Sequence, residues 1–289
     1  MRERAGTGSY EVRTMTPAEV GKAIGWARAE GWNPGLRDAT CFLTVDREGF
    51  LGGYLDGDLI ASISVVNYGD AFGFVGCYIV SEPHRRKGYG RALWLAALPH
   101  AGNRLIGLDG VPAQLANYER SGFELAYRNV RYGGRIDAHS EAVATTGRIV
   151  DIGEVPFAAL ATYDRACFPA LRDEFLSAWT TTSGHRALAF MAGDVLAGFG
   201  VLRRCHTGHK VGPLFADDAG VARALLVALA AGTGPEPVFL DVPEVGHAAV
   251  ALAEDLGMTP VFETARMYNG PAPDVALERI FGVSTFELG

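Results

Sequence analysis

The sequence of 289 residues has no apolar run long enough to span a membrane. Its longest such runs, residues 222–231 and 93–98, fall well short of the roughly 20 residues that a membrane-spanning helix needs. The first residues, MRERAGTGSYEVR, are charged and contain no apolar segment, so no secretory signal is visible. These two absences predict a cytoplasmic protein that has no membrane partner.

Cysteine and positive charge are also in short supply. The four cysteines, Cys41, Cys77, Cys167 and Cys205, form no CxxC pair and no His/Cys ligand spacing, which predicts reduced structural thiols and no metal site. Lysine and arginine number 26 against 33 acidic residues, for a net charge of −7. This balance argues against nucleic acid as a partner and modestly favours cationic small molecules. With 48% hydrophobic residues, the chain has material for about two packed domains.

Residues 72–98 contain the pattern that most strongly indicates a function. Phe72–Val80 is rich in aromatic and β-branched residues and predicts a strand, residues 81–84 a turn, and the apolar spacing after Tyr89 a helix. Between strand and helix lies RRKGYG, residues 85–90. Its glycines allow close backbone approach, and free helical amides, the helix dipole and basic side chains make a docking place for a pyrophosphate. A solvated basic turn is the alternative.

A second informative block covers residues 104–134. It predicts a strand at 104–109, a helix at 113–121 that contains Tyr118, and another strand at 123–132. A P-loop or Rossmann unit is excluded because the chain has no GxxxxGK[ST], and no GxGxxG at the first strand-to-helix turn.

Together the two blocks resemble the GCN5-related N-acetyltransferase (GNAT) superfamily. The family signature R/Q-x-x-G-x-G/A matches Arg85, Gly88 and Gly90, and the late helix ends like residues 118–123, YERSGF. The order of elements agrees as well, with a first strand, a helix and then a hairpin: Tyr10–Thr14, Pro17–Ala29 and residues 56–58. The resemblance covers residues 10–133. It implies an α/β (α+β mixed) fold whose mostly antiparallel sheet has a V-shaped splay and is flanked by helices.

The resemblance implies acetyl-CoA as co-substrate and no metal. Backbone groups of residues 78–80 would bind the pantetheine and polarise the thioester, and amides of residues 86–91 would hold the pyrophosphate. The implied binding set is Tyr78, Ile79, Val80, Arg85, Arg86, Lys87, Gly88, Tyr89, Gly90, Arg91 and Asn117. One departure is Val111, where the family commonly has an asparagine; Gln114 or Asn117 would have to substitute.

Tyr118 falls where the family often places a tyrosine that protonates the departing thiolate. A phenol with a pKa near 10 suits a thiolate leaving group. For the general base we predict Asp109, at the end of its strand, with Glu82 as a weaker candidate. An amine that arrives already deprotonated would need neither.

The acceptor is expected beside residues 26–50, which combine aromatic and acidic side chains. Trp26, Glu30, Trp32 and Asp38 are the predicted substrate-binding residues, since such a wall suits a protonated amine through cation–π and ion-pair contacts. Core aromatics and solvated acids are the alternative. The predicted activity is transfer of an acetyl group from acetyl-CoA to a primary amine of a small molecule, by direct attack in a ternary complex. Alternatives are a non-catalytic acyl-CoA sensor and a transferase for longer acyl groups.

The second half repeats the first in outline. Matching residues lie 132 to 136 positions apart: Asp58 and Asp194, Leu93 and Leu225, Asp109 and Asp241, Gly122 and Gly257. Such steady offsets indicate tandem GNAT folds. The longer pattern also looks like a subfamily of two-domain bacterial acetyltransferases, with GWNPG near Trp32 and RMY-x-G at residues 266–270. We predict a catalytic domain at 1–133, a linker at 134–147 and a degenerate domain at 148–289, in a monomer or homodimer.

At the position that corresponds to residues 85–90, the charge is reversed in the second half. At an offset of 132, Arg85 and Arg86 correspond to Asp217 and Asp218, and Gly90 to Ala222. A carboxylate beside a phosphate costs free energy even at high effective dielectric, so we predict that only the first half binds CoA. The last residues, 279–288, are strand-like in composition and are expected to lie inside the structure, completing the sheet of either half.

Overall fold

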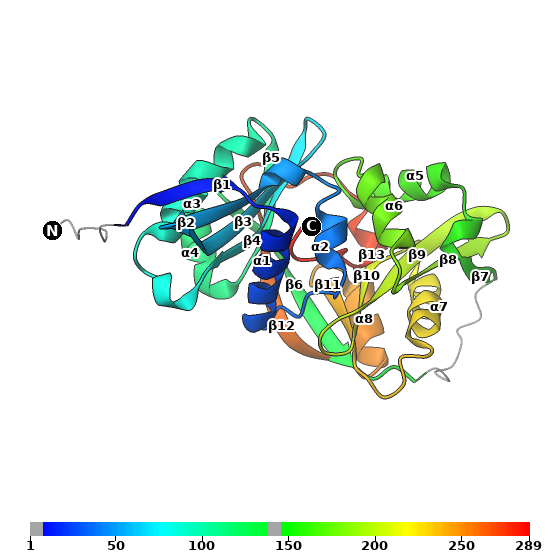
Figure 1. The fold of residues 1–289 in the computed structure, drawn as a ribbon. Coiled ribbons are helices and arrows are strands. Elements are labelled where there is room, and N and C mark those ends of the chain that lie inside the picture. The colour runs from blue at the N-terminus through cyan, green and yellow to red at the C-terminus, as the bar shows by residue number, and fades with distance from the viewer. Residues whose placement is uncertain (1–7, 138–145) are drawn as a thin grey trace.

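In the described residues, 8–137 and 146–289, the computed structural model has one 13-stranded sheet with helices on both faces (Figure 1). The spatial order is β1-β2-β3-β4-β5-β12-β6-β11-β10-β9-β8-β7, with β13 beside β10. All pairs are antiparallel except β4 with β5 and β10 with β11. The predicted mixed, mostly antiparallel fold class is confirmed.

The strands are β1 (Tyr10–Thr14), β2 (Phe50–Leu55), β3 (Asp58–Tyr68), β4 (Phe72–Val80), β5 (Leu105–Gly110), β6 (Glu124–Gly134), β7 (Arg148–Asp151), β8 (His185–Ala192), β9 (Val195–Arg204), β10 (His209–Ala216), β11 (Val238–Pro243), β12 (Thr259–Tyr268) and β13 (Ile280–Gly282). The helices are α1 (Pro17–Ala29), α2 (Asp38–Phe42), α3 (Tyr89–Ala97), α4 (Leu115–Glu119), α5 (Phe157–Cys167), α6 (Asp173–Thr181), α7 (Ala219–Ala230) and α8 (His247–Asp255).

Local signals explain why α1 and α3 form where the sequence predicts them. Helix α1 follows a capping box in which the Thr16 hydroxyl accepts from the Glu19 amide and the Glu19 carboxylate accepts from the Thr16 amide. Pro17 occupies the first turn, where its missing N–H costs nothing. In α3 the apolar spacing buries one face, with Leu93 and Trp94 packed against β3 and β4.

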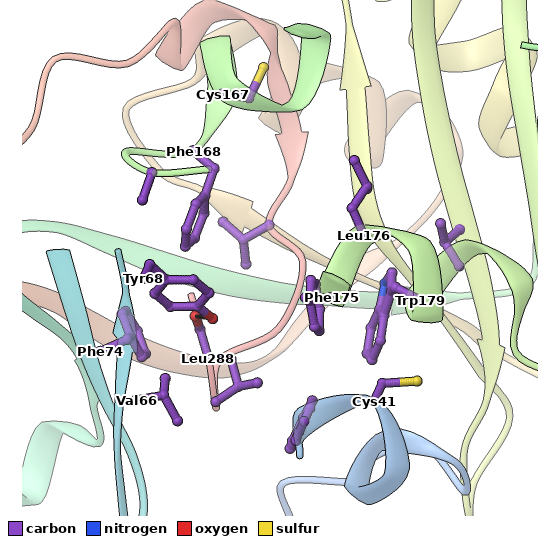
Figure 2. Close-up of a cluster of buried hydrophobic side chains, with 14 of the residues drawn as sticks. Cys41, Val66, Tyr68, Phe74, Cys167, Phe168, Phe175, Leu176, Trp179 and Leu288 are labelled. Carbon is purple, nitrogen blue, oxygen red and sulfur yellow. Dashed lines mark hydrogen bonds between the residues drawn. The ribbon is translucent and has the colours of Figure 1, made fainter. Parts of the chain in front are cut away.

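The two halves share a core. One cluster of buried side chains contains residues of α1 and α2 from the first half and of α5 and α6 from the second. Figure 2 shows Tyr68 and Phe74 of the first half facing Phe168, with Phe175 and Trp179 further along the same core. The Tyr68 and Phe168 rings meet edge to face with centroids 4.9 Å apart. All four cysteines are buried free thiols.

The halves also exchange a strand. β6 belongs to the first half in sequence but pairs with β11 of the second, and β12 of the second half pairs with β5 of the first. The two exchanged strands pair with each other at the centre of the sheet. Each half therefore completes its sheet with a strand from the other, and an isolated half would expose a long unpaired edge.

The C-terminus lies in the middle of the molecule (Figure 1). β13 pairs with β10 of its own half, and the residues after it cross to the first half, where the Tyr68 hydroxyl donates to the Leu288 carbonyl at 2.9 Å. A Cβ at Gly76 would lie 1.9 Å from the Glu287 carbonyl oxygen, so this contact requires glycine. The predicted internal C-terminus is confirmed, although only Ile280–Gly282 is strand.

Candidate active site

The strands β4 and β5 diverge, and this splay defines the candidate site. Their parallel pairing covers Phe72–Val80 only as far as Val75, which faces Leu108. Beyond that point β4 contains a bulge against β3, where Cys77 has a left-handed φ of 47°. Bulges re-aim strands and occur next to active sites. The backbone of residues 78–80 therefore leaves β5 and faces the open end of the splay.

A cradle follows directly after β4. Gly88, with φ 89°, is the N-cap of α3, and none of the described side chains caps this helix. The amides of the first turn therefore point out of the helix end without an internal partner. A Cβ at Gly90 would lie 2.8 Å from the Tyr78 hydroxyl, so glycine keeps the helix end close to the strand. The loop and first turn carry basic side chains that are largely exposed: Arg85, Arg86, Lys87 and Arg91. Free amides, a positive helix end and basic side chains fit a pyrophosphate.

Two of the predicted CoA contacts are engaged elsewhere. The Arg85 guanidinium donates to the Val80 carbonyl at 2.8 Å and forms an ion pair with Glu30. Asn117 is exposed on α4 and hydrogen-bonds Gln114 and Arg120. Both side chains are therefore already paired within the protein, unlike the amides of the first turn of α3. Tyr89 packs on Tyr10, with ring centroids 5.0 Å apart, and Ile79 is buried.

Tyr118 lies over the end of β5. Its ring packs against Trp94 with centroids 5.6 Å apart, and a Cβ on Gly110 would come within 2.6 Å of it. Burial, followed by the nearby Tyr78, raises the pKa of Tyr118 well above its usual value of 10. Among residues 8–137 and 146–289 its hydroxyl has no hydrogen-bond partner. The position suits a proton donor to a group in the splay, whereas the raised pKa makes the phenol a weaker acid than a free tyrosine.

Asp109 is held in a buried ion pair. Arg266 of β12 donates two hydrogen bonds to its carboxylate, at 2.8 and 2.7 Å, and Asn129 of β6 donates a third at 2.8 Å. The side chain of Asp109 has no exposed surface. Both carboxylate oxygens are engaged by Arg266 and one also by Asn129, and the side chain is enclosed, so this arrangement does not support the prediction that Asp109 is the general base.

The four predicted substrate-binding residues do not surround one pocket. Asp38 is fully buried, accepts from Arg203 at 2.6 Å and from the Gly35 amide at 2.8 Å, and has a lowered pKa to which Arg203 contributes. Glu30 pairs with Arg85 of the cradle. Trp26 is half-buried under Lys22, and Trp32 offers its carbonyl to Arg131 at 2.7 Å. The predicted wall of aromatic and acidic side chains is therefore absent from this part of the described structure.

A pocket lies beside the end of α1, and most of its lining residues could not be recognised from the sequence. It has a volume of about 390 Å³ and lies between the end of α1 and strands of the second half. Its lining is Arg28, Gly31, Asn33, Arg131, His206, Thr207, Phe239, Val261 and Phe262. We call it the seam pocket. Only Arg28, Gly31 and Asn33 fall within residues 26–50, where the acceptor was expected.

The corresponding place in the second half is closed. β10 pairs with β11 only up to Val211, and then Leu214 and Phe215 pair with β13. The helix that follows, α7, is capped by the Asp218 carboxylate, which accepts from the Val221 amide at 2.9 Å. Asp217 accepts from the Tyr163 hydroxyl at 2.8 Å and lies 3.4 Å from Arg279. A strand and an aspartate cap therefore take positions at which the first half has neither among its described residues.

The chain belongs to the GNAT superfamily, and it is an acyltransferase with two tandem GNAT folds. Residues 17–123 match the acetyltransferase (GNAT) family model, and residues 160–282 match a model described as an acetyltransferase (GNAT) domain. The chain is 32% identical over 265 residues to holothin acyltransferase of Pseudoalteromonas sp. (strain SANK 73390), covering 91% of this chain and 89% of that protein.

Solved structures agree on the fold. A putative acetyltransferase from Pyrococcus horikoshii matches with a TM-score of 0.81 and 22% identity, covering 100% of this chain and 99% of that one. A tandem GNAT protein from the clavulanic acid biosynthesis pathway matches with a TM-score of 0.64 and 17% identity, covering 91% and 100%. No helix in the described part of the chain is long and apolar enough to cross a membrane.

Proposed function

We propose that the protein transfers an acyl group, acetyl in the simplest case, from acyl-CoA to the amine nitrogen of a small molecule in a ternary complex. The observation that carries this proposal is the contrast between the open β4–β5 splay, with an uncapped helix end beside it, and its closed counterpart in the second half. The small-molecule acceptor is supported by the 32% identical relative, whose name assigns it the acylation of holothin.

In this proposal the pantetheine lies along residues 78–80, and the amides of residues 86–91 hold the pyrophosphate. The amine nitrogen attacks the thioester carbon and forms a carbon–nitrogen bond, and the bond between that carbon and sulfur breaks. Tyr118 gives its phenolic proton to the departing thiolate. The amine nitrogen loses a proton to solvent, and the Tyr118 phenolate regains a proton from solvent. A free tyrosine, with a pKa near 10, is already protonated at neutral pH, and burial raises the pKa of Tyr118 further.

The second half does not bind CoA in this proposal. Residues 148–289 supply β12, which borders β5, and the wall of the seam pocket. Their role is structural and acceptor-shaping.

The test is incubation of the full chain with acetyl-CoA and a panel of small amines, with release of free CoA thiol as the readout. Amine-dependent thiol release, with the acetylated amine detected by mass spectrometry, is the expected result. Tight acetyl-CoA binding without thiol release for any amine would instead indicate an acyl-CoA sensor.

A further inference from the structure

The seam pocket is built by both halves and is held firmly. The Asn33 amide nitrogen donates to the Thr207 carbonyl at 2.9 Å, and the Thr207 amide donates back to Asn33 at 3.0 Å. The Leu36 amide donates to the Arg204 carbonyl at 2.9 Å. Because these contacts join the loop after α1 to the turn between β9 and β10, the pocket is a fixed feature of the fold.

The pocket lies next to the cradle. Glu30 at the end of α1 pairs with Arg85 of the cradle, while Arg28 and Gly31 on either side of Glu30 line the pocket. On the sheet, Gly110 at the end of β5 faces Ala265, and Phe262 of the pocket lies three residues further along β12. At the usual rise per residue this is about 10 Å, which a small molecule can span.

The walls of the pocket are aromatic and apolar, with one unpaired positive charge. Phe239, Val261 and Phe262 supply the apolar surface. Arg131 stands over Phe262, 5.5 Å from its ring centre, and its charge is balanced by Asp241 at 2.6 Å. Arg28 is exposed and forms no ion pair within the described residues. Desolvation and then Arg28 lower the pKa of His206, so its ring is neutral at pH 7 and can hydrogen-bond or stack.

Carboxylates are missing from this lining, as far as the structure describes the chain. The acids around it are already paired: Glu30 with Arg85, Asp38 with Arg203, Asp109 with Arg266 and Asp241 with Arg131. A protonated amine would meet Arg28 without a counter-charge from the lining residues, which disfavours a cationic acceptor. One acid within electrostatic reach of Arg131, the buried Glu287, forms no ion pair among the described residues, but it does not line the pocket.

We propose that the seam pocket is the acceptor site and that it takes a flat aromatic amine, unprotonated at neutral pH, that carries a carboxylate or carbonyl oxygen. The ring packs between Phe239 and Phe262, the oxygen meets Arg28, and the amine points toward the end of β5. This inference rests on the proposed function and replaces the cationic acceptor that the sequence suggests.

The experiment measures thiol release from acetyl-CoA with three probes: 4-aminobenzoate, aniline and benzylamine. The first two nitrogens are neutral at pH 7 and the third is protonated. We expect 4-aminobenzoate to have a KM at least tenfold below that of aniline, and benzylamine to react most slowly. Efficient acetylation of benzylamine, or no reaction with 4-aminobenzoate, overturns the inference.

Two variants locate the site. Arg28→Ala should raise the KM for 4-aminobenzoate about tenfold and leave that for aniline unchanged, because only the carboxylate is lost as a partner. Val261→Trp should fill the pocket and raise the KM for both, and it is safe for folding because Val261 is 55% exposed. The matched control is Arg148→Ala, an exposed arginine on β7.

Calorimetry with acetyl-CoA separates this inference from the proposed function. All variants should bind acetyl-CoA like the unaltered chain. If they do so while Arg28→Ala and Val261→Trp leave both KM values unchanged, the seam pocket is not the acceptor site, although the chain can still be an acyltransferase. If the unaltered chain fails to bind acetyl-CoA, the proposed function itself is wrong.

Discussion

The two halves of the chain have the same strand order. They differ at the point where the parallel pair of strands in each half separates. In the first half the gap after Val75 stays open, and the helix beside it begins at an uncapped glycine. In the second half the gap after Val211 receives β13, and the helix beside it is capped by Asp218. Among the described residues, the same fold thus occurs once without a strand beside the diverging β4 and once with β13 paired to the corresponding strand β10.

The difference lies in what each half uses to satisfy the same backbone groups. A helix end needs partners for its free amides, either a ligand or a cap. A diverging strand needs a partner for its edge, either a ligand or another strand. In the second half Asp218 and β13 supply both from within the chain, whereas the first half leaves them for CoA in our proposal.

The largest expected effect comes from removing the C-terminal segment, residues 279–289. This deletes β13 and the buried side chains Ile280, Phe281, Val283, Phe286 and Leu288. Each buried apolar side chain contributes about 1.5–3 kcal/mol, so the loss is comparable to the whole stability of a typical domain. We expect the truncated protein to fail to fold or to melt far below the full chain in calorimetry.

A single substitution tests the same segment more gently. Leu288 is fully buried, so Leu288→Ala should lower the free energy of unfolding by about 2–5 kcal/mol. The control is Leu171→Ala, since Leu171 is 66% exposed and should matter little. Equal melting of both variants, and of the truncated chain, would mean that the tail is dispensable.

Next in size is the loss of CoA binding when the open helix end is blocked. Gly90→Trp places a large side chain where Gly90 faces the Tyr78 hydroxyl, and should abolish acetyl-CoA binding. Isothermal titration should show one site per unaltered chain and none in this variant. Gly21→Trp, on α1 with open space around it, is the control that should bind normally. Two equivalent sites per chain would contradict the asymmetry between the halves.

A smaller, purely kinetic effect is expected at Tyr118. Tyr118→Phe removes only the proton donor and should lower kcat about 10- to 1000-fold with little change in acetyl-CoA affinity. Since burial raises the pKa of this phenol, the tyrosine stays protonated, and its ionisation should not reduce kcat below about pH 10. Tyr132→Phe, a buried tyrosine in β6, is the control. An unchanged kcat with chemistry rate-limiting would make Tyr118 a packing residue.

The sequence predicts what depends on neighbours along the chain. The bounds of β1, α1 and β4 and the start of α3 follow from caps, prolines and apolar spacing, and so does the cradle at residues 85–90. The asymmetry between the halves was also visible, because an Arg pair and an Asp pair occupy matching positions.

The sequence did not predict what depends on distant partners. The arginines that pair with Asp38 and Asp109 are 165 and 157 positions away, so both acids resembled free functional groups. The exchange of β6 and β12 escaped prediction because both strands follow the same pattern of residues in their own half, and pattern alone does not fix which neighbour pairs with which.

The smallest expected effect tests whether the carboxylates of Asp217 and Asp218 or the strand β13 keeps CoA out of the second half. Asp218→Ala removes the cap of α7 and should cost about 0.5–2 kcal/mol in a denaturant melt. Asp255→Ala, an exposed aspartate at the C-terminal end of α8, is the control and should cost nothing, since a negative charge there opposes the helix dipole. The double variant Asp217→Ala/Asp218→Ala also removes both carboxylates from the place of the phosphate. We still expect one acetyl-CoA site per chain by titration, because β13 continues to occupy the gap beside β10. A second site in the double variant would show that the two carboxylates alone excluded CoA, and that β13 yields when they are gone.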